Sequence, residues 1–200
     1  KLFEICRLRG IPIFTFMNKM DRPAREPLEL LDELEKVLGI GAFPVTWPLG
    51  SGAEFIGVYD RLQKNLHLFE RTAHGQHRAP VRVSGIHDAG IRDQVPPQIL
   101  EPWLEELEVL MGAGESFDED QLRTGKITPV FFGSGMSNFG VQLLLDYFVK
   151  HGAPPQPRLS TNGPVAPDDP EFSGFVFKVQ ANMNPRHRDR LTFVRVCSGK

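Results

Sequence analysis

A short apolar run that ends in three polar side chains limits the folds open to this chain. Residues 11–16 are almost all apolar, and Asn18, Lys19 and Asp21 follow them. A continuous apolar run between punctuating residues is typical of a strand buried on both faces of a parallel sheet. Ligands of such sheets bind outside the carboxyl ends of the strands. We therefore expect these three side chains to stand at a binding site.

The carboxylate of Asp21 favours one kind of ligand. An ionised carboxylate only accepts hydrogen bonds, and guanine offers two adjacent donors, its N1–H and its 2-amino group. Adenine would leave this carboxylate desolvated and unpaired, at a cost of roughly 1.5–3 kcal/mol or more. The stem of Lys19 can lie along a base plane, and the amide of Asn18 suits tying neighbouring loops together. A strand followed by an ordinary polar turn is the alternative interpretation.

A second segment repeats this pattern. Residues 128–132 are largely apolar, and Gly133, Ser134, Gly135 and Met136 follow before a helical pattern begins. Small residues let backbone N–H groups approach a ligand closely, and the O6 atom of guanine needs such a donor. The two segments, in this order, are similar to the fourth and fifth motifs of translational GTPases. That resemblance implies that both segments bind a guanine nucleotide, GTP or GDP.

Four further stretches resemble the bacterial peptide chain release factor 3 family of translational GTPases. These stretches are residues 47–52, 55–60, 137–141 and 180–190. Elongation factor G shares the outline, but Trp-Pro-x-Gly-x-Gly at 47–52 and Asn-Pro-Arg-His-Arg-Asp-Arg at 184–190 favour the release factor family. The resemblance extends over nearly all 200 residues. One departure is Gly135, where many relatives carry Ala, and we expect it to cost little because the role there is a backbone N–H.

This resemblance implies a ribosome-associated enzyme that hydrolyses GTP with Mg²⁺ and promotes dissociation of the stop-codon-reading class I release factors. Phosphoryl transfer needs a phosphate-cradling loop, metal ligands and a group that orients water. The sequence contains no G-x-x-x-x-G-K-[ST] and no Asp-x-x-Gly switch motif of the family type. We therefore assign no catalytic residue and no metal ligand to this chain. We expect it to be an internal fragment whose catalytic half precedes Lys1.

Strands that alternate with helices predict an α/β fold. By resemblance, residues 1–152 are the C-terminal part of a doubly wound P-loop GTPase domain, with an insertion at about 61–97. Prolines among Ser, Thr, Asn and Gly predict a stiff linker at 153–170. In residues 171–200, apolar and polar side chains alternate as in half-buried strands. By resemblance these strands open a β-barrel second domain.

A polar loop between those last strands carries Arg186, Arg188 and Arg190. Arginine forks suit phosphate oxygens, so this loop is a candidate contact with ribosomal RNA. A plain polar hairpin tip is the alternative. The resemblance favours RNA, because the barrel of relatives faces the small ribosomal subunit.

Composition narrows the class of protein further. A formal net charge of −2 argues against a chain that coats nucleic acid non-specifically, and we expect no DNA partner. The sequence has no 18-residue apolar run and no secretory leader, which favours a cytoplasmic protein without membrane contact. Four histidines of the insertion lack the spacing of a metal site, and we interpret them as solvated loop residues. They are His67, His74, His77 and His87.

Two alternative functions stay open. An elongation-factor-G-like translocase would share the guanine motifs but would need further domains. A ribosome-binding module that keeps the fold without hydrolysing nucleotide belongs to a different class. An intact phosphate loop upstream of Lys1 would favour the enzyme, whereas a degenerate one would favour the binding module.

Overall fold

The computed structural model divides into two compact units, Lys1–Ala153 and Pro154–Lys200. The residues that the structure describes are 2–69, 81–85, 91–112, 117–181, 183 and 189–199. Within these residues, no helix combines the length and the apolar character needed to cross a membrane.

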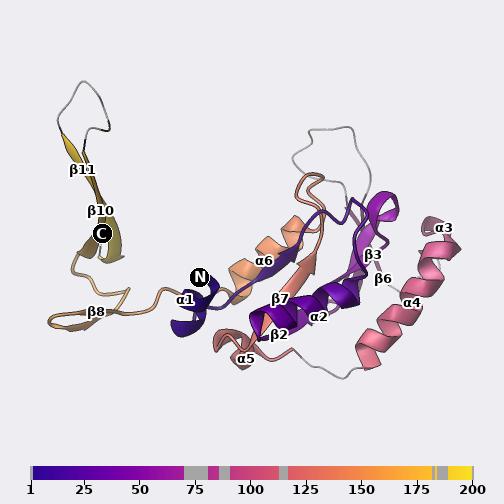
Figure 1. The fold of residues 1–200 in the computed structure, drawn as a ribbon, viewed down its shortest axis with the longest axis horizontal. Helices are drawn as coiled ribbons and strands as arrows, with labels where there is room; N and C mark the ends of the chain where they lie inside the picture. The colour runs from indigo at the N-terminus through magenta and orange to yellow at the C-terminus, as the bar shows by residue number, and fades with distance from the viewer. Residues whose placement is uncertain are drawn as a thin grey trace. The chain divides into compact units, whose positions relative to one another are not determined.

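Figure 1 shows the fold coloured along the chain, with most of the helices and strands labelled. The first unit contains α1 (Leu2–Leu8), β1 (Thr15–Met17), α2 (Pro27–Leu38), β2 (Gly41–Pro44), β3 (Thr46–Leu49), the 3-10 helix η1 (Gly52–Glu54), β4 (Gly57–Asp60), β5 (Asn65–Phe69), β6 (Val81–Gly85), α3 (Ile91–Gln94), α4 (Pro97–Gly112), α5 (Glu119–Arg123), β7 (Ile127–Phe132) and α6 (Val141–His151). The second unit contains β8 (Arg158–Ser160), β9 (Gly163–Val165), β10 (Ser173–Ala181) and β11 (Arg190–Ser198).

A three-stranded parallel sheet in the order β1-β7-β2 forms the centre of the first unit. Met17 of β1 pairs with Phe132 of β7, so the two strands end at the same edge of the sheet. Strand β1 is shorter than the apolar run at residues 11–16 from which it is predicted. Before Thr15, a side-chain hydrogen bond takes the place of the backbone hydrogen bonds between strands. The hydroxyl of Thr128 donates a hydrogen bond to the carbonyl of Ile13 at 2.8 Å.

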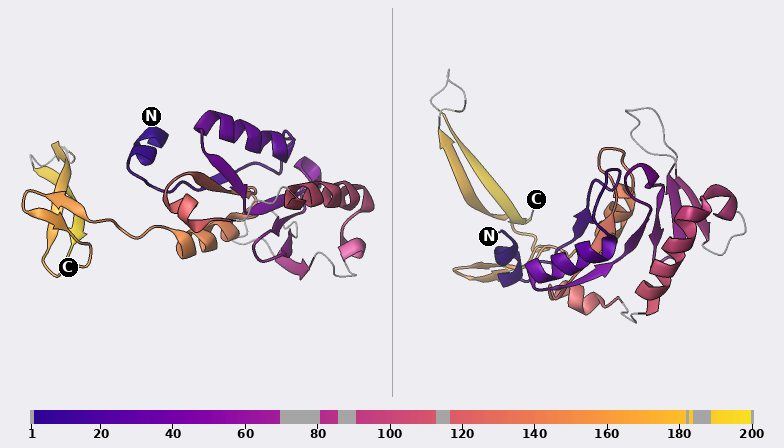
Figure 2. Two further views of the ribbon diagram at one scale, coloured as in Figure 1. Left: turned by 90° about the horizontal axis from the view of Figure 1, so that it is seen from below. Right: turned by 45° about the vertical axis from the view of Figure 1, so that its right-hand side comes forward.

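Strand β7 sends alternate side chains into two separate hydrophobic cores. Val130 and Phe132 are buried in a cluster that includes Leu31 of α2. Phe131 is buried in a second cluster with Tyr147 of α6. Helices α2 and α6 therefore lie on opposite faces of the parallel sheet, as the views in Figure 2 also show. This two-layer cover is what a doubly wound α/β domain requires.

A second sheet is antiparallel, in the order β3-β4-β5-β6. The sequence pattern predicts a single strand over residues 42–48, but that prediction is wrong. Val45 separates β2 from β3, and these two strands belong to different sheets. The hydroxyl of Thr46 accepts a hydrogen bond from the Phe132 N–H at 2.9 Å. This side chain closes the end of the parallel ladder, so the backbone is free to turn into the second sheet.

The predicted insertion contributes β5 and β6 to this antiparallel sheet. His67 lies in β5 and is half-buried, so the interpretation of it as a solvated loop residue is wrong. Burial lowers the pKa of His67 from its ordinary value. His74, His77 and His87 lie outside the described residues.

Helix α4 packs against the second sheet through Trp103. The indole N–H of Trp103 donates to the carbonyl of Pro48 at 2.9 Å, and the side chain is buried. Pro102 lies inside this helix, past the first turn. Glu106 lies on the same helix and is half-buried. Burial is the main cause that raises the pKa of Glu106, and the negative charge of Glu26 adds to it.

We expect Glu106→Gln to stabilise the first unit at pH 8. A carboxyl whose pKa is raised on folding stabilises the fold below its ordinary pKa, near 4.5, and loses that contribution as the pH rises through the folded value. The gain in melting temperature should therefore shrink between pH 8 and pH 4.5. Thermal unfolding at both pH values measures this gain. The control is Glu105→Gln, which changes an exposed neighbouring residue on α4. Equal shifts for both variants at pH 8 would contradict the prediction.

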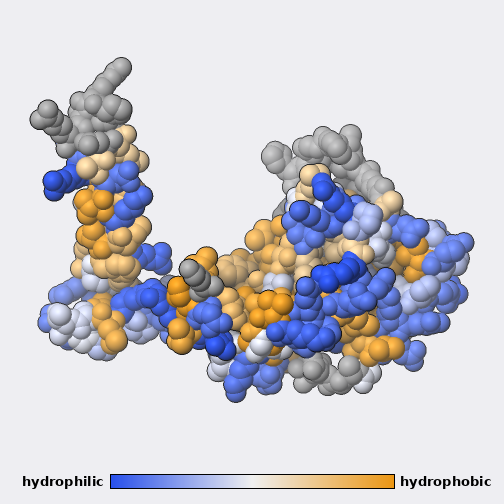
Figure 3. Space-filling view, in the orientation of Figure 1, coloured by the Kyte–Doolittle hydropathy of each residue, from blue (hydrophilic) through white to orange (hydrophobic). Residues whose placement is uncertain are grey.

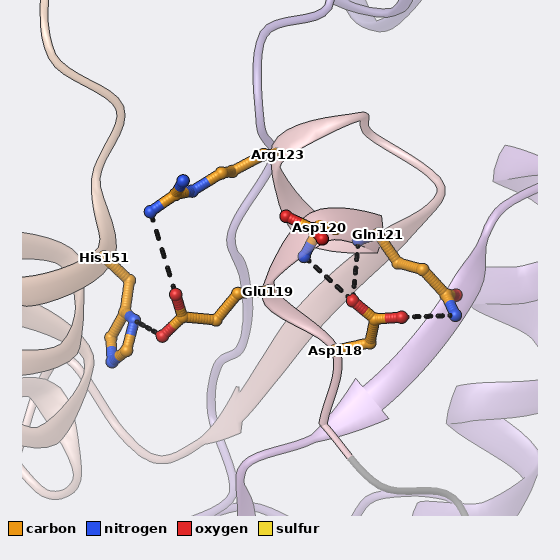
Figure 4. A network of polar contacts seen from close by, with 6 residues as sticks. All are labelled: Asp118, Glu119, Asp120, Gln121, Arg123 and His151. Atoms are coloured by element: carbon orange, nitrogen blue, oxygen red, sulfur yellow. Dashed lines mark hydrogen bonds and ion pairs between the residues drawn. The ribbon is translucent and has the colours of Figure 1, made fainter.

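A polar network joins α5 to the end of α6 (Figure 4). Asp118 caps α5 by accepting hydrogen bonds from the backbone N–H groups of Asp120 and Gln121, and bonds from Gln121 hold the pKa of Asp118 below its ordinary value. Glu119 lies 3.7 Å from Arg123 and 3.1 Å from Nδ1 of His151. These contacts attach the last helix of the first unit to the body of that unit.

The second unit consists of two antiparallel hairpins, β8–β9 and β10–β11. The first hairpin lies within the segment for which the sequence predicts an extended linker. Ser160 stabilises its turn by donating to the Gly163 carbonyl at 2.7 Å and accepting from the Asn162 N–H at 3.1 Å. Hairpin β10–β11 exposes several apolar side chains, including Phe175 and Phe177. Figure 3 shows hydrophobic surface along this hairpin.

Candidate functional site

The two segments singled out from the sequence meet at one edge of the parallel sheet. The backbone N–H of Gly133 donates to the Met17 carbonyl at 3.0 Å, and the N–H of Met20 donates to the Gly133 carbonyl at 3.1 Å. The parallel register brings Met17 beside Phe132, so the loops that follow β1 and β7 start side by side. This is the edge at which α/β sheets bind their ligands.

The side chain of Asn18 joins these two loops. Its Oδ1 atom accepts hydrogen bonds from the backbone N–H of Lys19 at 2.8 Å and of Gly135 at 2.9 Å. Lys19 adopts a left-handed backbone with φ of 70°, which a non-glycine residue rarely does. The two bonds to Asn18 Oδ1 hold this turn and the loop after β7 in one arrangement.

Lys19 and Asp21 present their charged groups to the outside of this turn. The Lys19 side chain is exposed and Asp21 is half-buried. Among the described residues neither side chain makes a hydrogen bond or an ion pair. A carboxylate and an ammonium group, from residues two positions apart in the chain, are therefore available together for a ligand that has adjacent donors and a flat face.

The loop after β7 has fewer available donors than the sequence suggests. Ser134 is fully buried, and its backbone N–H and carbonyl bond to the carbonyl and N–H of Phe139, both at 2.9 Å. The N–H of Gly135 is donated to Asn18. Within the described residues, the N–H of Met136 has no such partner, and the Met136 side chain is exposed. The role of Ser134 in this structure is thus to shape the turn.

A cavity of about 370 Å³ lies beside this turn, on the side of α2. It is lined by Phe16, Met17, Asn18, Lys19, Met20, Arg22, Pro23, Ala24, Arg25 and Leu30. Its volume is in the range of small-molecule sites. A larger cavity of about 630 Å³ lies among η1, β5, α3 and α4, and none of the predicted site residues lines it.

We expect Asn18→Ala to loosen the joined loops. It removes the acceptor of two backbone N–H groups, and one lost hydrogen bond costs roughly 0.5–1.5 kcal/mol. Hydrogen exchange at the Gly135 amide should speed up by about tenfold. Asn18→Asp is the matched control, because it keeps an oxygen at the same position and should retain slow exchange. Equal exchange in Asn18→Ala and wild type would contradict the bracing role.

The three predicted arginines belong to the second half of the prediction, and the structure describes one of them. Arg190 pairs with Ala181 at the end of hairpin β10–β11 where the two strands are connected, in the second unit, and Arg186 and Arg188 lie outside the described residues. In the part of the chain that the structure describes, no group of three or more His, Cys, Asp or Glu side chains is arranged to hold a metal ion.

Comparisons with known proteins agree with this architecture. Residues 1–154 match the elongation factor Tu GTP binding domain, and residues 171–200 match elongation factor G domain 2. A crystal structure of a protein from Thermus thermophilus covers 98% of this chain with a TM-score of 0.60 at 20% identity, and the chain covers 29% of that protein. At this identity the likeness concerns the fold alone. Together these matches confirm the predicted fold class.

Closer relatives match the chain over its whole length. Peptide chain release factor 3 of Gloeobacter violaceus is 56% identical, that of Synechococcus elongatus 55% and that of Nostoc punctiforme 53%, each over all 200 residues. The similarity predicted from the motifs is thereby confirmed. The chain spans 38%, 36% and 37% of these relatives, respectively.

Proposed function

The chain belongs to the family of the elongation factor Tu GTP-binding domain, within the translational GTPases, and we propose that it supplies the guanine-reading part of a GTPase of the release factor 3 type. In this proposal the complete protein binds and hydrolyses GTP on the ribosome and promotes dissociation of class I release factors. Those factors are contacted indirectly, through the ribosome. The setting is the cytoplasm.

The observation that carries the proposal is the bond from the Gly135 N–H to Asn18 Oδ1, at 2.9 Å. It fixes the loop that carries Asp21 against the loop after β7. The Asp21 carboxylate accepts the N1–H and 2-amino group of guanine, and the Lys19 stem packs along the base. The O6 atom of guanine takes a backbone N–H from the loop after β7, and Met136 supplies it because the Gly135 N–H is already donated to Asn18.

The chemistry of hydrolysis belongs to other parts of the complete protein. The sequence contains no phosphate-cradling motif, and the described residues do not fit a Mg²⁺ site. We propose that the phosphate loop, the Mg²⁺ ligands and the water-orienting group lie in the remainder of the relatives, of which this chain spans 38% or less. The residues of this chain bind and orient the base, and none of them moves a proton.

The names of the relatives favour the release factor over the two alternatives. The full-length matches are peptide chain release factors 3, which argues against a translocase of the elongation factor G type. A module that binds the ribosome without nucleotide would have no need for an unpaired Asp21 beside a braced Asn18. The intact pair therefore favours the enzyme.

Binding of GDP and ADP tests the proposal. Isothermal titration calorimetry of the full-length protein should detect binding of GDP and no binding of ADP. Adenine offers no hydrogen-bond donors that match the Asp21 carboxylate. The 200-residue chain alone should bind GDP far more weakly, since it lacks the phosphate contacts. Equal affinity of the full-length protein for GDP and ADP, or no binding of either, would overturn the proposal.

The arginines of the polar loop give a second, separate prediction. We expect Arg186→Ala combined with Arg188→Ala to weaken association of the full-length protein with ribosomes and to lower the dependence of affinity on salt. Each phosphate contact that is lost should reduce the slope of log K against log [salt] by somewhat less than one unit. Arg123→Ala, on α5 of the first unit, is the control for loss of positive charge. An unchanged slope would favour the alternative interpretation, in which the loop is a plain polar hairpin tip.

A further inference from the structure

A glycine-rich turn of the second sheet holds the loop that carries Asp21. The backbone N–H of Gly52 donates to the Met20 carbonyl at 2.8 Å. The N–H of Met20 donates to Gly133 at 3.1 Å, so the polar backbone groups of this one residue bond to two different sheet-end loops. The Met20 side chain is 1% exposed and belongs to the same buried cluster as Leu49 and Phe55, which flank the turn.

The turn also packs against the residues that follow Asp21. Gly52 has φ of +59°, and a Cβ there would lie 3.3 Å from the Pro23 nitrogen and 3.5 Å from the Arg22 carbonyl carbon. The turn thus contacts the chain on both sides of Asp21. It forms a hydrogen bond with the residue before Asp21 and packs against the backbone after Asp21. A side chain at this position would be strained by the left-handed backbone and would press on the chain at Pro23.

The turn itself is closely packed and hydrogen-bonded. Gly50 has φ of +78°, and a Cβ there would lie 2.1 Å from the Glu54 carbonyl oxygen. Leu49 and Phe55 on its two sides are fully buried, and the Ile56 N–H donates to the Leu49 carbonyl at 3.1 Å. At the neighbouring Pro48, the carbonyl accepts the indole N–H of Trp103. A loop that rests on this turn is held by the whole second sheet and α4.

We infer that Gly52 and Met20 are positioning residues for guanine recognition, and that the turn at residues 50–52 sets the placement of the Asp21 carboxylate. The inference rests on the proposed function, because it assigns these residues to the same nucleotide site. It links the antiparallel sheet, which has no contact with the ligand in the proposal, to the lifetime of bound guanine nucleotide. A displaced carboxylate loses alignment with one of its two donors.

Gly52→Ala in the full-length protein tests this inference, with Gly39→Ala as the matched control. Gly39 has φ of +67°, but a Cβ there would have no neighbouring atom within 4 Å, so Ala brings the same backbone strain without touching the Asp21 loop. Displacement of a fluorescent GDP should show release about three- to tenfold faster in Gly52→Ala, as expected for one disturbed hydrogen bond. Gly39→Ala should release GDP as wild type does.

The ratio of GDP affinity to inosine diphosphate affinity separates positioning from a general loss of stability. Inosine lacks the 2-amino group, so this ratio reports the second bond of Asp21. We expect the ratio to fall in Gly52→Ala and to stay unchanged in Gly39→Ala. Release rates and ratios equal to those of Gly39→Ala would overturn the inference while leaving the proposed function intact. Wild-type protein that does not prefer GDP to ADP would overturn both.

Hydrogen exchange of the wild-type protein keeps the inference testable where Gly52→Ala does not fold. Coupling between two sites is reciprocal, so GDP should slow exchange of the Gly52 amide if the turn holds the bound loop. The Gly39 amide, which donates to the Glu35 carbonyl at the end of α2, is the internal reference. Slower exchange at Gly52 alone would support the inference, and unchanged exchange at Gly52 would overturn it.

Discussion

Asp21→Asn should change the base preference of the full-length protein from guanine to xanthine. The amide keeps one acceptor but replaces the second with a donor, which faces the 2-amino group of guanine. Loss of the charge-assisted pair costs roughly 1.5–3 kcal/mol or more, so GDP affinity should fall about tenfold to a hundredfold or further. Xanthine carries a 2-oxo group at that position and should gain affinity, because the new N–H₂ donates to it. Competition between GDP and XDP for the protein measures both changes.

A matched substitution separates this effect from loss of a surface charge. Asp93 is exposed on α3 and belongs to neither of the joined loops. Asp93→Asn should leave the affinities for GDP and XDP as they are in wild type. The assignment of Asp21 as the base-reading residue would fail if Asp21→Asn kept the wild-type affinity for GDP, or if it weakened GDP and XDP equally.

The position of the site could be predicted from sequence because it depends on strand ends. Two apolar runs, each followed by small or polar residues, place Asn18 and Gly135 at the carboxyl ends of two parallel strands. Parallel neighbours in one sheet end at one edge, so their loops are expected to meet. The α/β fold class could be predicted for a similar reason, because the alternation of apolar strand patterns with helical patterns can be seen in the local sequence. The assignment to GTP depended on resemblance, not on the pattern alone.

Other features depended on contacts that no local pattern reports. The break at Val45 arises because the Thr46 hydroxyl bonds to Phe132, a residue 86 positions along the chain. His67 is half-buried because β5 has neighbours on both sides, whereas the apolar residues around it indicate a strand without showing how many strands flank it. The hydrogen bond between Gly52 and Met20 joins two turns. In the sequence, Gly52 indicates a turn but does not indicate which other loop that turn contacts. Long-range side-chain and backbone contacts of this kind set the geometry of the site.

Gly133→Ala should destabilise the first unit strongly, since the loop after β7 has no room for a side chain there. A Cβ at Gly133 would lie 2.2 Å from the Phe139 carbonyl oxygen and 2.7 Å from the ring of Phe16. The backbone of Gly133 also bonds to Met17 and Met20, so the residue cannot shift without breaking those bonds. Overpacking of this kind costs roughly 1–3 kcal/mol or more. For a unit of this size the melting temperature should fall by roughly 5–10 °C.

Gly135→Ala, two residues further along the same loop, is the matched control. Its Cβ would meet Asn18 Oδ1 at 3.5 Å, an ordinary contact, and its φ is not in the left-handed region. The N–H that bonds to Asn18 is kept, so stability should change by no more than about 0.5 kcal/mol. GDP affinity of the full-length protein should stay within about twofold of wild type. Melting temperatures of the two variants decide the matter, because equal losses would mean that close packing at Gly133 does not hold the two loops together.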